Sequence, residues 1–105
     1  MLRLFFVPET TSALDVPAPL DGGPEHLQHY VRSFYVFAGD PAEVVQFIRA
    51  DEASDGATIL SVAAPLERAL TDVPPDIAAT FPPIDGPGVY WKSGRAFFPW
   101  GSDTG

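Results

Sequence analysis

The pattern of apolar and polar positions in the first part of the chain predicts strands. The segment Leu2–Val7 places apolar side chains on both faces of an extended backbone, which is typical of a strand inside a sheet. A second run, Tyr30–Ala38, is rich in aromatic and β-branched residues that suit a pleated surface. We therefore expect two strands, the second of them central.

The clearest local signal follows that second strand and predicts a helix. Asp40 stands as the N-cap, Pro41 occupies the first helical position, and Glu43 lies three residues after the cap. This arrangement satisfies free backbone amides of the first turn and favours the positive end of the helix dipole. We expect the helix over Pro41–Glu52, with its apolar side on the sheet and Gly56 in a left-handed conformation after its end.

Further elements follow the helix. Thr58–Ala64 predicts a third strand, and its pairing with the second strand, parallel or antiparallel, stays open. Pro65 is expected to open a short helix that runs through Thr71, and Asp76–Phe81 is expected to form one more helical turn.

The last apolar segments predict a hairpin. Val89–Trp91 and Ala96–Phe98 are expected to pair with each other around a tight turn at Gly94. Lys92 and Arg95 would then be solvated charges at the tip of this hairpin.

These elements together predict one α+β domain over residues 1–105. We expect a mixed or antiparallel sheet of about five strands, with one main helix packed on one face and a C-terminal β-hairpin. A chain of 105 residues is long enough for one modest core. The tail, residues 101–105, is expected to fray.

The stretch from Pro8 to Pro24 interrupts the pattern of strands. Its prolines, glycines and acids predict a long proline-rich loop, and unstructured connections above about 12 residues are uncommon in compact domains. One interpretation is a partner-binding loop. The other, which we favour, is a surface loop pinned by Leu14, Val16 and Leu20.

Charge and cysteine content narrow the possible functions. The chain carries 14 acidic and 6 basic residues, a formal net charge of −8, and no cysteine. The negative electrostatic potential of such a chain repels nucleic acids and anionic lipids and favours encounter with basic proteins. An acidic composition is also explained by the need for solubility alone. The lack of cysteine excludes disulfides, thiolate metal sites and cysteine nucleophiles.

Catalytic and metal-binding patterns are weak. His26 and His29 would share a face of a helix, but they have no obvious third ligand, and in a strand they would point to opposite faces. Neither a nucleophile elbow nor a glycine-rich phosphate loop is present. We therefore expect no enzyme, no metal and no cofactor.

The expected location is the cytoplasm. The opening apolar run is too short for a signal peptide, and no later run approaches the roughly 20 residues that cross a bilayer. Frequent Ala, Pro, Gly, Asp and Arg indicate a GC-rich genome, and we expect a bacterial source.

The predicted function is a small acidic protein-binding module that inhibits a basic partner protein, in the style of an immunity protein or antitoxin. We assign the partner-facing charges to Asp15, Asp21 and Glu25. One alternative is a self-associating subunit, such as a homodimer, that uses an apolar strand edge or the aromatic hairpin. The other is a small enzyme or ligand-binding fold that uses His26 and His29.

Overall fold

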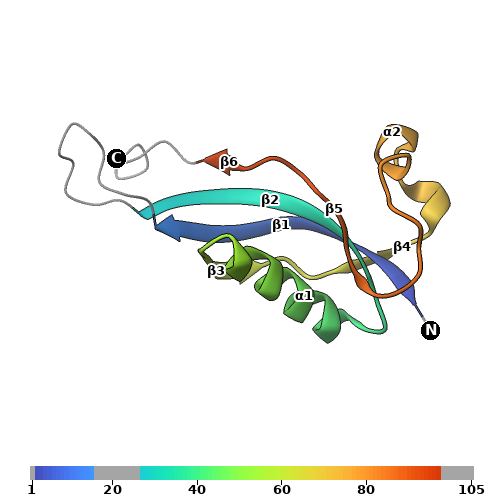
Figure 1. Cartoon of the computed structure of the whole chain (residues 1–105), viewed down its shortest axis with the longest axis horizontal. Coiled ribbons are helices and arrows are strands. Elements are labelled where there is room, and N and C mark those ends of the chain that lie inside the picture. Colours follow the sequence, from blue (N-terminus) through green and yellow to red (C-terminus); the bar gives the residue numbers. More distant parts are fainter. Residues whose placement is uncertain (1, 16–26, 98–105) are drawn as a thin grey trace.

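The computed structural model describes residues 2–15 and 27–97 and confirms the α+β class (Figure 1). A six-stranded antiparallel sheet carries one main helix. In chain order the elements are β1 (Arg3–Asp15), β2 (Leu27–Ala38), α1 (Pro41–Ser54), β3 (Ala57–Val62), β4 (Leu66–Arg68), the 3₁₀ turn η1 (Leu70–Asp72), α2 (Pro75–Ala78), β5 (Gly88–Lys92) and β6 (Ala96–Phe97).

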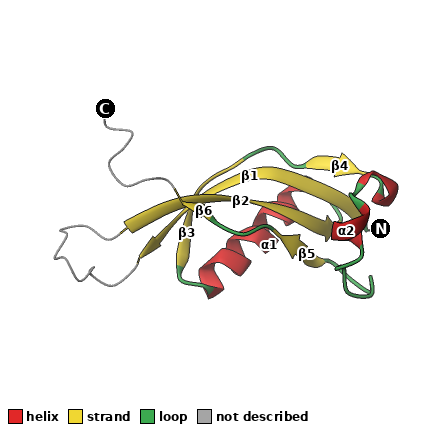
Figure 2. Ribbon diagram, turned by 90° about the horizontal axis from the view of Figure 1, so that it is seen from above, coloured by secondary structure: helices red, strands yellow, loops and turns green. Residues whose placement is uncertain are grey.

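The sheet has the order β3-β1-β2-β5, with β4 also pairing with β1 and β6 also pairing with β2. Figure 2 shows β4 alongside β1. Every pair is antiparallel. Because β1 lies between β2 and β3 and is antiparallel to both, the two strands that flank α1 run in the same direction without pairing. The sequence left open whether β2 and β3 pair parallel or antiparallel. They do not pair with each other, because β1 lies between them.

The first strand continues through Pro8 to Asp15, so the prediction of a loop from residue 8 was wrong for this half of the stretch. A register shift between Val7 and Thr10 places two residues of β1 opposite one residue of β2, which is a β-bulge. Proline is tolerated at a bulge because it has no amide to contribute to the ladder. The Ser33 hydroxyl donates to the Pro8 carbonyl across 2.8 Å. Residues 16–24 of the predicted loop lie outside the described residues.

The helix predicted from Pro65 to Thr71 is also wrong. Leu66–Arg68 forms strand β4, which pairs with residues 4–6 of β1, and only a 3₁₀ turn follows. Backbone pairing along the open edge of β1 outweighs the weak helical preference of so short a segment. The next predicted turn is present in part, as α2.

The C-terminal strands do not form the expected hairpin with each other. Both β5 and β6 pair with β2, so they follow one another along the same edge of that strand. Ser93 joins them to β2: its amide donates to the Ser33 carbonyl (2.9 Å), and its hydroxyl accepts from the Ser33 amide (2.8 Å). Phe98 lies outside the described residues.

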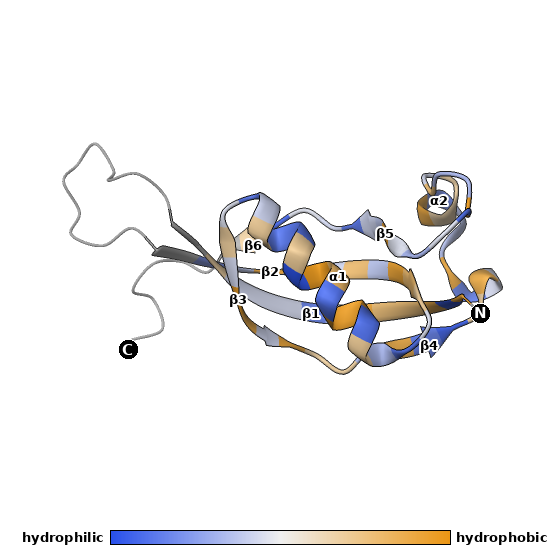
Figure 3. Ribbon diagram, turned by 60° about the horizontal axis from the view of Figure 1, so that its bottom comes forward, coloured by the Kyte–Doolittle hydropathy of each residue, from blue (hydrophilic) through white to orange (hydrophobic). Residues whose placement is uncertain are grey.

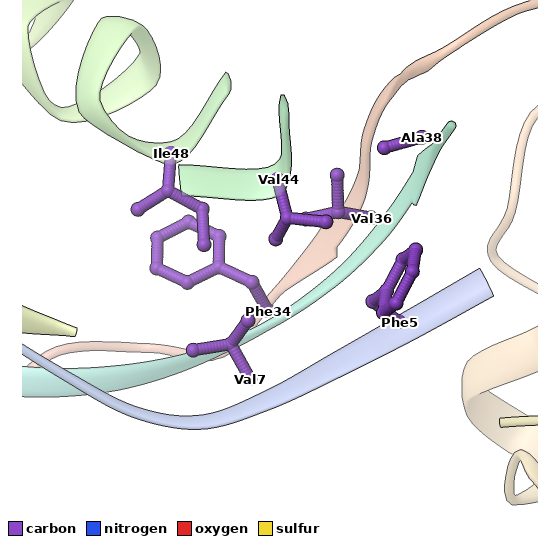
Figure 4. Packing of buried hydrophobic residues seen from close by; sticks show 7 residues of the cluster. All are labelled: Phe5, Val7, Phe34, Val36, Ala38, Val44 and Ile48. Atoms are coloured by element: carbon purple, nitrogen blue, oxygen red, sulfur yellow. The ribbon is translucent and has the colours of Figure 1, made fainter. Parts of the chain in front are cut away.

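Two apolar clusters lie on the two faces of the sheet. The cluster under α1 contains Phe5, Val7, Phe34, Val36, Ala38, Val44 and Ile48 (Figure 4). The cluster on the opposite face contains Leu4, Tyr35, Phe37 and Val73, with Phe81, Tyr90 and Trp91 packed against it. The expectation that the first strand is apolar on both faces because it is interior is therefore confirmed.

The helix α1 begins as the sequence predicts. Asp40 Oδ1 accepts from the Glu43 amide (2.8 Å), and Glu43 Oε1 accepts from the amide of Gly39, one residue before the cap (2.6 Å). Gly56 after the helix has a φ of 83°. The helix extends to Ser54 and lies across one face of the sheet with polar and apolar residues around its circumference (Figure 3). None of the helices in residues 2–15 and 27–97 combines the length and the apolar composition that a membrane span needs.

Candidate functional site

The buried face of the helix α1 ends in an acidic side chain, that of Glu52. Val44, Ile48 and Glu52 are spaced four residues apart on the face toward the sheet, and all three are fully buried. A buried carboxylate is costly unless other groups pair with it. Glu52 therefore marks the point where the apolar core under α1 becomes polar.

Two side chains of β2 reach this carboxylate. The Tyr30 hydroxyl donates a hydrogen bond to Glu52 Oε1. Arg32 Nη1 lies 3.6 Å from Glu52 Oε2, and the Arg32 side chain is only 9% exposed. The phenol thus supplies the direct hydrogen bond, and the guanidinium supplies the compensating charge.

The β-bulge in β1 brings two hydroxyl groups to the same place. Before the bulge, Val7 faces α1; after it, Thr10 and Ser12 take over that face, opposite Arg32 and Tyr30 respectively. Both hydroxyl residues are fully buried. Without the extra residue in β1, the strand would turn its other side chains toward the helix.

The connection between β5 and β6, residues 92–95, lies beside these groups. Arg32 Nε and Nη2 both donate to the Ser93 carbonyl, at 3.0 and 2.7 Å. The Arg95 guanidinium carbon lies 4.9 Å from the centre of the Tyr30 ring, within the range of a cation–π contact. We call the set Thr10, Ser12, Tyr30, Arg32, Glu52 and Arg95 the Glu52 cluster.

An outer layer of ion pairs adjoins the Glu52 cluster. Lys92 Nζ lies 2.8 Å from Asp51 Oδ2 and 3.9 Å from Asp55 Oδ2, while Arg95 Nη2 lies 3.0 Å from the same Asp55 oxygen. The expectation that Lys92 and Arg95 are simply solvated at a hairpin tip is therefore wrong. Acids near the negative end of a helix are unfavourable by themselves, and cations from β2 and residues 92–95 offset this effect.

Two pKa values of the Glu52 cluster differ from their ordinary values. Burial, and then the hydrogen bond to Glu52, raise the pKa of Tyr30 above 10.0. Hydrogen bonding with Tyr30 raises the pKa of the Arg95 guanidinium. Both effects favour a neutral phenol that donates and a guanidinium that stays charged. At neutral pH the Tyr30 phenol is therefore neutral and the Arg95 guanidinium is charged.

The predicted partner-facing residues lie elsewhere or outside the described chain. Asp15 is the last residue of β1 and pairs with Leu27 of β2. Figure 1 shows that β1 ends far from α2, toward the other end of the molecule. Asp21 and Glu25 lie outside the described residues, so the structure neither gathers nor separates the three acids.

The histidine pair is likewise only half described. His29 is exposed and lies in β2 opposite Ala13, while His26 lies outside the described residues. Within residues 2–15 and 27–97, no three histidine, aspartate or glutamate side chains gather in a way that could hold a metal ion. The position of His29 in a strand removes the helical spacing on which the idea of a metal pair depended.

Cations and acids are distributed unequally over the described surface. Four of the six basic residues form ion pairs: Arg32, Lys92 and Arg95 at the end of α1, and Arg3 with Glu67 at 3.4 Å. Within the described part of the chain, Arg49 and Arg68 form none. The exposed acids include Glu9, Asp40, Asp72, Asp76 and Asp85. Internal pairing thus uses most of the positive charge.

Comparison with known proteins gives no relative: no protein-family model, curated protein or solved structure matches the chain. Inference about function therefore depends on geometry and charge.

Sequence reasoning missed the Glu52 cluster. It treated Glu52 as the last residue of the predicted helix. The spacing of Val44, Ile48 and Glu52 was the available signal, because side chains four residues apart share a helix face. Tyr30, Arg32 and Phe34 follow the matching two-residue period of a strand face.

Proposed function

We propose that this chain is a small acidic protein-binding module of the bacterial cytoplasm that inhibits a basic partner protein, as immunity proteins and antitoxins do. The partner-facing charges in this proposal are Asp15, Asp21 and Glu25. The observation that supports it most is the uneven pairing of charged side chains. Four of the six basic residues form ion pairs within the chain, whereas many acidic residues are exposed.

Charge of this kind supports association with a basic surface. A net charge of −8 on 105 residues attracts positively charged proteins over a distance set by ionic strength and repels nucleic acids. Complementary charge raises the rate of encounter and selects among partners more than it raises affinity. Binding that depends on this charge therefore weakens as salt rises.

The test is affinity capture from native lysate at low and high salt, using the tagged full chain. Three proteins are compared: wild type, the triple variant Asp15→Lys, Asp21→Lys, Glu25→Lys, and a matched variant Asp72→Lys, Asp76→Lys, Asp85→Lys. Both variants change the net charge equally. The acids of the matched variant lie in the segments around α2, far from the end of β1 (Figure 1).

We expect wild type to retain one basic protein in stoichiometric amount at low salt and to release it at high salt. The first variant should lose at least about tenfold in affinity, which corresponds to roughly 1.4 kcal/mol, and the matched variant should lose less. Capture of no basic protein would overturn the proposed function. Equal losses in both variants would overturn the assignment of the three acids while leaving a charge-driven partner.

A second candidate, self-association, is favoured by the edge strand β3. This strand ends the sheet, contains neither proline nor charge, and presents Leu60 with 51% of its surface exposed. Unprotected edges of this composition are templates for pairing with another chain. Sedimentation of wild type and Leu60→Lys tests it: a dimer that becomes a monomer in the variant supports a homodimer, and a monomeric wild type excludes it.

A further inference from the structure

The Glu52 cluster contains buried polar atoms for which the described residues supply no hydrogen-bond partner. Within the described residues, the buried side-chain nitrogen and oxygen atoms without a hydrogen-bond partner are Thr10 Oγ1, Ser12 Oγ, Arg32 Nη1, Glu52 Oε2 and Arg95 Nε. All five belong to this one cluster. Because native proteins satisfy nearly all buried polar groups, such a concentration indicates a bound molecule.

The hydrogen-bonding properties of these atoms determine which kind of molecule can bind there. The two guanidinium nitrogens only donate, Glu52 Oε2 only accepts, and the Thr10 and Ser12 hydroxyls do either. The occupant must therefore both donate and accept hydrogen bonds. It must also be very small, because the atoms belong to packed neighbours: Thr10 pairs with Arg32 across the β1–β2 ladder.

The distance between Arg32 and Glu52 fits a bridging group. Arg32 Nη1 and Glu52 Oε2 are 3.6 Å apart, which is too long for a direct hydrogen bond. A single oxygen placed to one side can lie at about 2.8 Å from both atoms. Arg32 Nη1 and Glu52 Oε2 can therefore both form a hydrogen bond with one shared molecule.

We propose that the Glu52 cluster is an internal hydration site. One water molecule accepts from Arg32 Nη1, donates to Glu52 Oε2, and completes its bonds with the hydroxyls of Thr10 and Ser12. Buried waters typically make about three such bonds to otherwise unsatisfied groups. This inference is independent of the partner protein proposed above.

Other occupants fit less well. An anion would face the carboxylate of Glu52, and a metal cation would face the guanidinium of Arg32. Among the described residues, no three histidine, aspartate or glutamate side chains come together in a way that could hold a metal ion. The Arg95 guanidinium is already paired with Asp55 at 3.0 Å, so the opposite charges of Arg32 and Glu52 are the ones left at the site. Water matches such a mixture of donors and acceptors.

The experiment combines structure with energetic coupling in the full chain. A crystal structure of the protein, at a resolution that defines ordered water, shows whether an oxygen lies within hydrogen-bond distance of Arg32 Nη1, Glu52 Oε2 and a hydroxyl. The variants Thr10→Val and Ser12→Ala, alone and together, then report by denaturant unfolding whether the two hydroxyls act through a shared molecule. Thr11→Val is the matched control, because Thr11 lies between them in sequence and its side chain points to the opposite face.

We expect an ordered water with at least three bonds. We also expect the folding equilibrium constant of the double variant to differ by about fivefold from the product of the single effects, whereas Thr11→Val and Ser12→Ala combine within about twofold. A dry cluster, with both hydroxyls bonded directly to protein atoms, would overturn the proposal. Independent effects of Thr10→Val and Ser12→Ala would overturn the shared water.

Discussion

Tyr30 of β2 and Glu52 of α1 are joined by a hydrogen bond from the phenol to the carboxylate, and both side chains are fully buried. This bond ties the last turn of the helix to the centre of the sheet. It replaces the apolar contacts that Ile48 makes one turn earlier and Val44 makes two turns earlier. In a low-dielectric interior such a bond is strong when made and costly when one partner is lost.

Removing the phenol oxygen tests this bond. Tyr30→Phe keeps the ring but leaves Glu52 Oε1 without its donor, so we expect a loss of about 1–3 kcal/mol in the free energy of unfolding. Tyr90→Phe is the control, because the Tyr90 hydroxyl donates to the Gly86 carbonyl at a half-buried site (2.7 Å). Urea unfolding should show the smaller loss for Tyr90→Phe; equal losses would contradict a special role for the buried pair.

Removing the charge of Glu52 tests its pairing with Arg32. Glu52→Gln leaves a nearly buried guanidinium uncompensated, and breaking a buried ion pair in this way costs about 3–5 kcal/mol. The exposed pair of Arg3 and Glu67 provides the comparison, since Glu67→Gln should cost at most about 1 kcal/mol. Thermal and urea unfolding measure both, and a Glu52→Gln protein as stable as Glu67→Gln would refute the interpretation.

The raised pKa of Tyr30 predicts a loss of stability in alkali. Below pH 10.0 both folded and unfolded chains keep the phenol proton, so the stabilisation from the neutral phenol is fully present. As pH rises above this value, the unfolded chain loses its proton first, and the stability falls until the folded pKa is passed. Unfolding free energies across this range should decline less steeply for Tyr30→Phe than for wild type. Parallel profiles would contradict the prediction.

The left-handed backbone at Gly56 predicts a penalty for any side chain. A Cβ added there would meet no atom within 4 Å, so the expected cost of Gly56→Ala, about 1–2 kcal/mol, comes from the φ of 83° alone. Gly86→Ala is the matched control: it is equally open and has no positive φ, so it should be neutral or raise stability slightly. Chemical denaturation of both variants measures the cost of the left-handed backbone, and a Gly56→Ala protein as stable as Gly86→Ala would contradict it.

Local features were predictable from the sequence because they involve residues a few positions apart. The cap at Asp40, the helix from Pro41, the left-handed Gly56 and the apolar faces of β1 and β2 all follow from short-range hydrogen bonding and periodicity. These features were enough to establish the α+β class.

The sequence by itself therefore determined the main helix, the central strands and their buried faces. Tertiary structure alone decided that Pro8 lies in a strand, that Leu66–Arg68 pairs with β1, and that β6 follows β5 along β2. The charges that surround Glu52 come from strands distant in sequence. Strand edges pair, and buried charges form ion pairs, with whatever groups the fold brings next to them. The pattern of neighbouring residues in the sequence does not specify those groups.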